Sequence, residues 1–388
     1  MKTKRLFLLA SAIFVIILIL IFINPEYKTK EINYPGAYEA LQFLTHSRAY
    51  PADDIPKDKY YQEYLYSKNV LETKSSLNDS SSWETIGPTN IGGRMISVAV
   101  NPFNSNTLYA GSASGGLWRT HNATGAADWH RIHTGFPVLG VMAIAISPVD
   151  SNTIYIGTGE VYGYQQSVGG TVIRTTRGSY GFGILKTTDG GLNWSLSLDW
   201  TNNIERGVQC IRINPQNPNS IYAATTEGIY KSTNAGASWQ LVLPVLMGED
   251  IVIHATDTTK IMVSCGNLGS AGSGIYRSLD GGVNWNQLSG IPSYNGKTLL
   301  GMFQANPNVI YASVANTPAQ IGLFKTTNFG DNWTQVHYQD VCEYQGWFSH
   351  WVAVHPTDVN QVIHAGKYIY KSTNGGNIIN QVYANHWD

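Results

Sequence analysis

The sequence predicts an all-β fold, a β-propeller of four-stranded blades, from three observations. An eight-residue phrase, Ser/Thr-x-Asp/Asn-x-Gly-x-x-Trp, occurs intact four times at intervals of 45, 46 and 48 residues, beginning at Thr187, Ser232, Ser278 and Thr326. Degraded copies begin at Thr120, with two extra residues, and at Ser372, with Ile379 in place of Trp. Short β-branched or aromatic runs surround every copy. A repeat of roughly 40 to 50 residues with four strand-like runs is typical of a propeller blade, and six blades are recognisable.

Each unit has the same internal order. In the second unit, the runs MAIAISP (142–148) and NTIYIG (152–157) predict two strands that end in turn residues. The run GILKTT (183–188) predicts a third strand that leads into the phrase, and a fourth begins after Trp194. Gly, Asn, Asp and Pro between the runs favour tight turns.

The phrase itself predicts a turn rather than a catalytic site. Its hydroxyl and Asx side chains can hydrogen-bond backbone amides, its Gly allows positive φ, and its Trp can pack between blades. These structural positions are Asp189, Trp194, Asn234, Trp239, Asp280, Trp285, Asn328, Trp333 and Asn374.

The N-terminus predicts export. Three basic residues within the first five precede an apolar stretch, 6–23, that only Ser11 interrupts. Residues 1–24 are therefore expected to be a signal anchor or a signal peptide. The rest of the chain would lie outside the cytoplasm, secreted or anchored in the membrane by residues 6–23.

Residues 25–82 predict a helical spacer or hairpin and a linker. Helical periodicity occurs over 35–47 and over 57–70, and a polar run covers 72–82. The propeller is then expected over 83–388. Trp83–Ile86 reads as a fourth strand without a blade of its own, whereas Ile379–Val382 completes the sixth blade. The ring is therefore expected to be incomplete and truncated at its C-terminal end, unless the Trp83 strand displaces the Ile379 strand and the ring closes at six.

Composition excludes several classes of function. Only 13% of residues are charged and the net charge is −1, so no surface for nucleic acid is expected. Three cysteines at different phases of the repeat predict no disulfide ladder, and Cys210 is expected in the core. His386 and Asp388 form a His-x-Asp pair without a third ligand, so neither a metal nor another cofactor is expected.

The phrase resembles the Asp-box, or BNR repeat, of sialidases, xyloglucanases, sortilin-like receptors and plastid assembly factors. The segment WETIGPTNIGGR (83–94) and the sequence after it resemble a family of bacterial secreted proteins with sortilin-like propellers. The resemblance implies an extracytoplasmic propeller that binds a partner. The Phe/Tyr-Arg-Ile-Pro segment of sialidases is absent, and Ala113 stands where xyloglucanases carry a catalytic Asp.

The predicted function is therefore a non-catalytic binding module for a protein or glycan partner. One alternative is a glycoside hydrolase-like enzyme with unassigned carboxylates, and another is an assembly scaffold for exported proteins. The candidate binding segment is an insertion, 159–183, that lengthens one interval to 67 residues. Its candidate ligand-binding residues are Glu160, Tyr162, Tyr164, Arg174, Arg177 and Tyr180. The alternative for this insertion is a Gly-rich surface hairpin. A second candidate segment is 342–350, and Glu249 with Asp250 is interpreted as a solvated turn.

Overall fold

A computed structural model describes residues 59–74 and 93–383, apart from 126–127, 139, 167–171 and 177–179, together with a few residues between 43 and 56. The chain divides into two units, 1–56 and 57–388, and the second contains every element described below. Among the described residues, no helix has both the length and the apolar character needed to cross a membrane. The apolar stretch 6–23, most of the helix predicted over 35–47, and Trp83–Ile86 lie outside the described residues.

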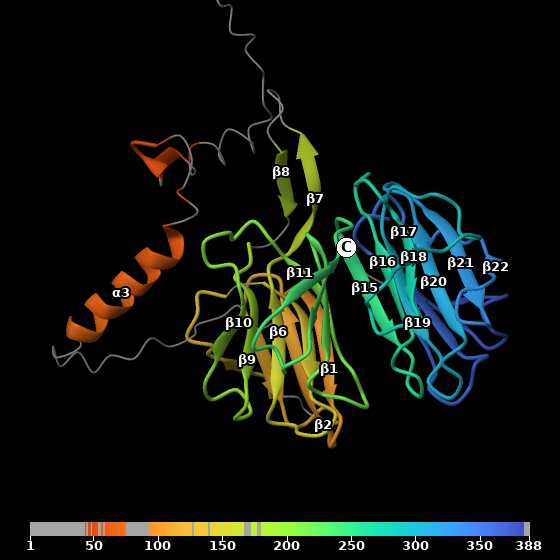
Figure 1. Ribbon diagram of the computed structural model, residues 1–388, viewed down its shortest axis with the longest axis horizontal. Coiled ribbons are helices and arrows are strands. Elements are labelled where there is room, and N and C mark those ends of the chain that lie inside the picture. The colour runs from red at the N-terminus through yellow and green to blue at the C-terminus, as the bar shows by residue number, and fades with distance from the viewer. Residues whose placement is uncertain are drawn as a thin grey trace, which may run out of the picture. The chain divides into compact units, whose positions relative to one another are not determined.

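Six four-stranded antiparallel sheets, named blades 1 to 6 in chain order, make up the fold (Figure 1). Blade 1 contains β1 (Met95–Asn101), β2 (Asn104–Ser112), β3 (Leu117–Thr120) and β4 (His130–Ile132). Blade 2 contains β5 (Val141–Ile146), β6 (Ile154–Thr158), β9 (Gly183–Thr187) and β10 (Ser195–Asp199). Blade 3 contains β11 (Val208–Ile213), β12 (Ile221–Thr225), β13 (Gly228–Ser232) and β14 (Gln240–Leu243).

The remaining blades repeat this order. Blade 4 contains β15 (Gly248–Ile253), β16 (Ile261–Cys265), β17 (Gly274–Ser278) and β18 (Asn286–Gln287). Blade 5 contains β19 (Thr298–Met302), β20 (Ile310–Ala315), β21 (Gln320–Thr326) and β22 (Thr334–His337). Blade 6 contains β23 (Trp351–Val354), β24 (Val362–Ala365), β25 (Ile369–Ser372) and β26 (Asn380–Tyr383). A separate two-stranded hairpin, β7 (Val161–Gln166) and β8 (Val172–Thr176), is inserted in blade 2.

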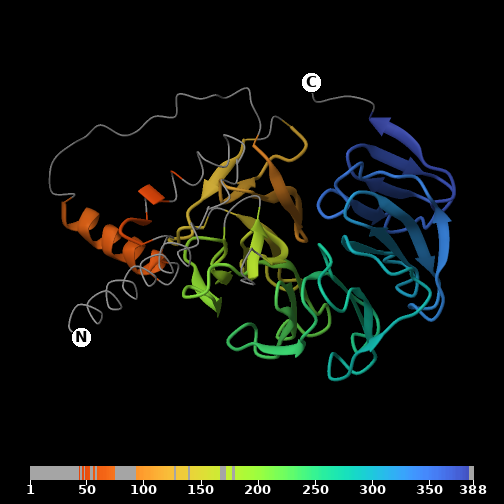
Figure 2. The same ribbon diagram turned by 90° about the horizontal axis from the view of Figure 1, so that it is seen from above.

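The blades follow one another around a common centre, as the colour order in Figure 2 shows. The first strands contact one another in sequence, β1 with β5, then β11, β15, β19 and β23, so these strands line the axis. The all-β fold with four-stranded blades is thus confirmed, and the described residues form six blades.

Apolar side chains fill the space between successive blades. Between blades 1 and 2, for example, Tyr109 and Leu117 pack against Ile154 and Leu185, and none of the four is more than 3% exposed. Burying one such side chain contributes roughly 1.5 to 3 kcal/mol. Because each blade is too thin to enclose its own core, the fold depends on blade-to-blade packing.

The helix predicted over 57–70 is observed as α3 (Tyr60–Lys74). The ring of Tyr61 lies nearly parallel to that of Phe136, with centroids 6.1 Å apart, and also contacts Phe182. The Tyr64 hydroxyl donates a 3.1 Å hydrogen bond to the Gly135 carbonyl. The helix therefore packs on the linker between blades 1 and 2.

Candidate functional site

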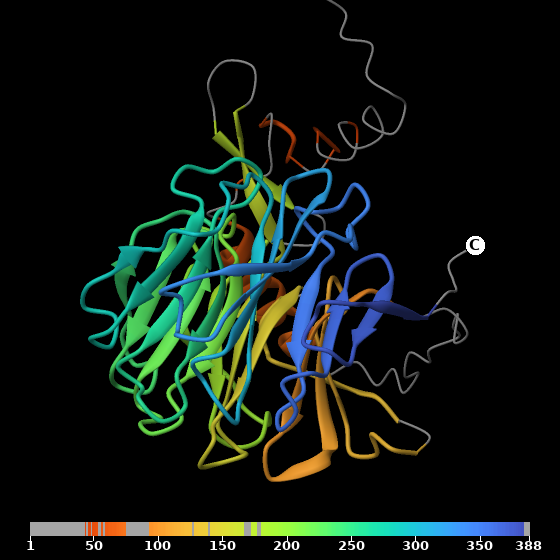
Figure 3. The same cartoon turned by 90° about the vertical axis from the view of Figure 1, so that its right-hand side faces the viewer.

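The ring has two faces that carry different loops. Since the strands of each blade are antiparallel, the loops after the first and third strands lie on one face, here called the turn face. The loops after the second strands and the linkers between blades lie on the other, the hairpin face. The β7–β8 hairpin projects from this second face in the two views of Figures 1 and 3.

The repeated phrases form the turns of the turn face, here called repeat turns. In blade 2, the Thr187 hydroxyl donates a 2.7 Å hydrogen bond to Asp189 and accepts one from the Gly191 amide. Asp189 Oδ1 also accepts the amides of Leu192 and Asn193, and these bonds, with Asn193 first, lower the pKa of Asp189 to about 2. The equivalent hydroxyl bonds are made to Asn234, Asp280, Asn328 and Asn374. All five side chains are thus engaged within their own turns.

The fourth residue of each repeat turn joins two blades. Its φ is positive at Gly190 (71°), Ala235 (53°), Gly281 (71°), Phe329 (53°) and Gly375 (72°). The carbonyl of this residue accepts hydrogen bonds from the preceding blade. Ala235 O accepts from the Tyr155 hydroxyl and from Lys186 Nζ, both at 2.9 Å. Equivalent donors are Arg119 to Gly190, Tyr222 and Lys231 to Gly281, Arg277 to Phe329, and Tyr311 to Gly375. We call this contact the carbonyl latch.

The tryptophans of the repeat turns complete the same interfaces. The indoles are half-buried and pack in the apolar core that their blade shares with the preceding one; these residues are Trp194, Trp239, Trp285 and Trp333. Ile379 occupies this position in blade 6.

On the hairpin face, an ion pair anchors the base of the β7–β8 hairpin. Both terminal guanidinium nitrogens of Arg94, Nη1 and Nη2, donate to the carboxylate of Glu160, with Nη2 at 2.8 Å from Oε2. The Tyr162 hydroxyl donates a 2.6 Å hydrogen bond to Glu160 Oε1. The Tyr162 ring meets Trp347 and Phe348 edge-on, with centroids 5.3 and 5.4 Å away. The anchor thus connects blade 1, blade 2 and the linker before blade 6.

The structure separates the six candidate ligand-binding residues. Glu160 and Tyr162 are fully buried in the anchor. Tyr164 and Arg174 are backbone register partners in the pairing of β7 with β8, and Tyr180 is 36% exposed. Arg177 lies outside the described residues. The insertion thus forms a hairpin, and ligand binding by these residues stays a prediction.

The interpretation of Glu249 and Asp250 as a solvated turn is wrong. Both lie on β15 at the axis and are 4% and 0% exposed, because the first strand of each blade is enclosed by its neighbours. Asp250 accepts from Arg212 Nη2 and from the amides of Ile251 and Leu300. Burial raises the pKa of Glu249 to about 8 and lowers that of buried Lys297. The sequence pattern hides this burial, since Gly248 precedes the acidic pair as in a turn.

A buried chain of imidazoles joins blades 5 and 6. His337 Nε2 is 3.1 Å from His364 Nδ1, and His364 Nε2 is 2.8 Å from Ser313 Oγ, which also lies 2.7 Å from His350 Nδ1. Burial lowers the pKa of His337 to about 4. Burial is also the main cause that lowers the pKa of His364 to about 3. No three His, Cys, Asp or Glu side chains within the described ranges are placed to hold a metal ion.

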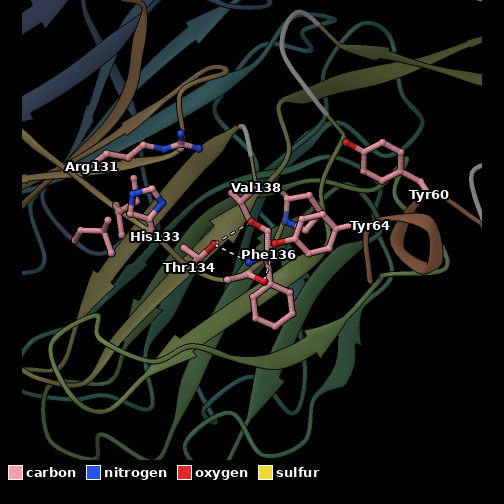
Figure 4. A pocket seen from close by; sticks show the side chains of 12 residues that line it. Tyr60, Tyr64, Arg131, His133, Thr134, Phe136 and Val138 are labelled. Atoms are coloured by element: carbon pink, nitrogen blue, oxygen red, sulfur yellow. Dashed lines mark hydrogen bonds between the residues drawn. The ribbon is translucent and has the colours of Figure 1, made fainter. Parts of the chain in front are cut away.

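A pocket of about 300 Å³ opens between α3 and the linker from blade 1 to blade 2 (Figure 4). Tyr64 of the helix lies beside Phe136 of the linker, and Tyr60 lies farther from it on the same helix. Arg131 and His133, both exposed, lie on the opposite side with Thr134, whose hydroxyl is hydrogen-bonded to Phe136. The lining therefore combines aromatic rings with cationic and neutral polar donors, and it contains no carboxylate.

Ala113, at the position where xyloglucanases carry an Asp, is 4% exposed and its amide donates to the Arg94 carbonyl.

No family model matches the chain. No curated protein matches it either. Among solved structures, the chain is similar to an ancestral GH74 enzyme, with 21% identity and a TM-score of 0.55 over 78% of this chain and 39% of the enzyme. It is also similar to the GH74 xyloglucanase from Xanthomonas campestris (18% identity, TM-score 0.48, 74% of this chain and 53% of the enzyme). Another neighbour is YCF48 bound to D1 peptide (14% identity, TM-score 0.47, 78% of this chain and 84% of YCF48). The chain spans about half or less of the two GH74 enzymes, and the likeness to the first of them shows the propeller fold alone.

Proposed function

We propose that this protein is an exported, non-catalytic β-propeller that binds a protein or glycan partner on its hairpin face. The observation that carries the proposal is the pocket beside α3, where aromatic rings, Arg131 and His133 converge without a carboxylate. Aromatic faces and guanidinium donors are suited to bind sugar rings or peptide groups. Its volume accommodates about one sugar ring or one large side chain. The sortilin-like resemblance supports the same kind of function.

The contacts of Glu160 and Asp250 support a binding role. Glycoside hydrolysis requires two carboxyl groups about 5 to 9.5 Å apart that reach the substrate. Glu160 is occupied by Arg94 and Tyr162, and Asp250 by Arg212 and two amides. Both are buried, so neither presents a free oxygen pair to a ligand in the pocket beside α3.

The binding proposal can be tested with glycan and peptide panels and the full chain. Once a ligand is found, Arg131→Ala and His133→Ala should each weaken its affinity by about tenfold, because each removes a donor from the pocket. His130→Ala is the matched control, since His130 lies beside Arg131 on β4 but does not line the pocket. Equal affinities for all three variants would contradict the proposed site.

The hairpin can be tested separately. Replacing residues 163–178 with a short Gly-containing turn should reduce partner capture if the hairpin contributes contacts. Capture at the parental level would remove the hairpin, but not the pocket, from the site.

A glycoside hydrolase remains the second candidate, and one observation favours it. Burial raises the pKa of the Glu249 carboxyl, which is the direction that a general acid requires. Incubation with a polysaccharide panel tests this candidate. Release of products that Glu249→Gln abolishes would establish the enzyme and overturn the non-catalytic proposal.

A further inference from the structure

The outer sides of blades 1 and 6 carry apolar residues that face no other blade within the described part of the chain. In blades 2 to 5, alternate residues on the first three strands point toward the next blade, and the others point back toward the preceding one. Blade 1 has no described blade behind it, and blade 6 has none ahead. Comparing the exposed fractions of residues at the same place in different blades shows which sides lack a described neighbouring blade.

On blade 1, the residues that point away from blade 2, here called the backward positions, are exposed. Val98 and Val100 are 68% and 55% exposed, whereas the equivalent Ile144 and Ile146 of blade 2 pack in the core with blade 1. Trp118 is half-exposed, and Leu185 at its position in blade 2 is fully buried. Trp129, the tryptophan of the first repeat turn, lies on the same side.

On the same side of blade 1, Trp118 and Trp129 border a groove of about 480 Å³. Its apolar lining includes Met95, Ala110, Trp118 and Trp129. A groove of this kind on a sheet face indicates a surface that another element covers.

On blade 6, the residues that point away from blade 5, here called the forward positions, are exposed. Trp351, Ile363 and Ile369 are 50%, 45% and 43% exposed. Their equivalents in blade 2 are Ala143, Tyr155 and Ile184, which are 5%, 1% and 0% exposed against blade 3.

Blade 6 also carries the donor half of a carbonyl latch. Lys371 lies on β25 at the position that Lys186 and Lys231 occupy on β9 and β13, and it is exposed. Those two lysines donate to the fourth-residue carbonyl of the next repeat turn. A blade ahead of blade 6 would present such a carbonyl to Lys371.

We infer that both faces bind one further four-stranded blade of the same repeat, carried on the same polypeptide, so that the ring is completed by a seventh sheet. At each of the five observed interfaces, a blade of this repeat covers the positions that are exposed on blades 1 and 6. All five join blades that are covalently connected. A single blade of about 45 residues has too small a core to fold alone, which favours this source over a separate protein.

The test appends one blade, with the consensus sequence of blades 2 to 5, to the full chain. Amide hydrogen exchange is then compared with that of the 388-residue chain. We expect exchange in residues 95–101 and 369–372 to slow at least about tenfold, and acrylamide quenching of tryptophan fluorescence to decrease. No slowing in a folded fusion would overturn the inference.

Matched variants of the fusion localise the effect. Val98→Asp should abolish the protection, because it places a charge in the new interface. Val149→Asp should retain it, since Val149 is similarly exposed, at 62%, but lies in the turn between β5 and β6.

Measurements on the 388-residue chain alone keep the inference testable if the fusion does not fold. Hydroxyl-radical footprinting should label Trp129 and Trp351 at every protein concentration. Protection of both in a monomer would show that other residues of this chain fill the gap. Protection that appears only in a dimer would identify a second copy as the occupant, and either result would overturn the inference.

Discussion

The hydroxyl of Tyr155 in blade 2 donates a 2.9 Å hydrogen bond to the carbonyl of Ala235, in the repeat turn of blade 3. The two residues are 80 positions apart, and the Tyr155 ring is 1% exposed. The repeat turn is therefore not only a local bend. Its positive φ at the fourth residue directs a carbonyl into the preceding blade, so each turn also secures an interface between blades.

Removing this bond should weaken the ring. Tyr155→Phe is expected to lower the free energy of unfolding by about 1 kcal/mol, because the carbonyl keeps its bond from Lys186 but loses one donor. Urea denaturation measures the change. Tyr338→Phe, at a site 77% exposed, is the control and should have no measurable effect. Equal effects at the two sites would contradict a latch.

The repeat turn requires a hydrogen-bond acceptor at its third position. Asp280→Ala should lower the melting temperature, because Ser278 and the amides of Val283 and Asn284 all lose their acceptor. Asp280→Asn should lower it less, since Asn234 and Asn328 serve as the acceptor at this position in other blades. Calorimetry compares the variants, and equal melting temperatures for Asp280→Asn and Asp280→Ala would contradict the role of the acceptor.

The same carboxylate should show a pH dependence. Hydrogen bonds, with the Asn284 amide first, lower the pKa of Asp280 to about 2 in the folded state. Its stabilising contribution is therefore present above the unfolded pKa near 4 and is lost as the pH falls toward 2. Melting temperatures of the parent and of Asp280→Asn, recorded between pH 5 and pH 2, should converge. A constant difference would contradict the shift.

The imidazole chain should make the protein sensitive to mild acid. The folded pKa values of His337 and His364 are about 4 and 3, whereas an unfolded His titrates near 6.5. The unfolded state therefore binds more protons below pH 6.5, and the free energy of unfolding should fall as the pH decreases from about 6.5 toward 4. His364→Ala should reduce this slope by about one proton. His130→Ala, whose side chain is 66% exposed, should leave it unchanged.

The Arg94–Glu160 pair that anchors the hairpin should contribute more to the free energy of unfolding than a surface ion pair does. Arg94→Ala leaves the Glu160 carboxylate buried with only the Tyr162 hydroxyl among the anchor's donors, which should cost roughly 2 to 3 kcal/mol. Hydrogen exchange should increase in residues 161–163 in particular. Lys260→Ala, which breaks the exposed pair with Asp257, should cost less than about 1 kcal/mol. Similar costs would contradict the anchor.

The sequence by itself determined the features that depend on short-range chemistry. The period of the phrase established the blades, and the spacing of Thr187, Asp189 and Gly191 predicted a hydrogen-bonded turn, because all its partners lie within a few residues. The insertion was located by the same period. Its residues could not be sorted into buried Glu160 and exposed Tyr180 from the pattern alone.

Only the tertiary structure decided what depends on neighbouring blades. The burial of Glu249 and Asp250, the latch between Tyr155 and Ala235, and the exposure of Val98 follow from which sheet stands beside which. Val98 and Ile144 have the same place in their repeats, yet one is exposed and the other is packed in a core. A repeated sequence specifies what each blade offers to its neighbours, whereas burial is set by whether a neighbour is present.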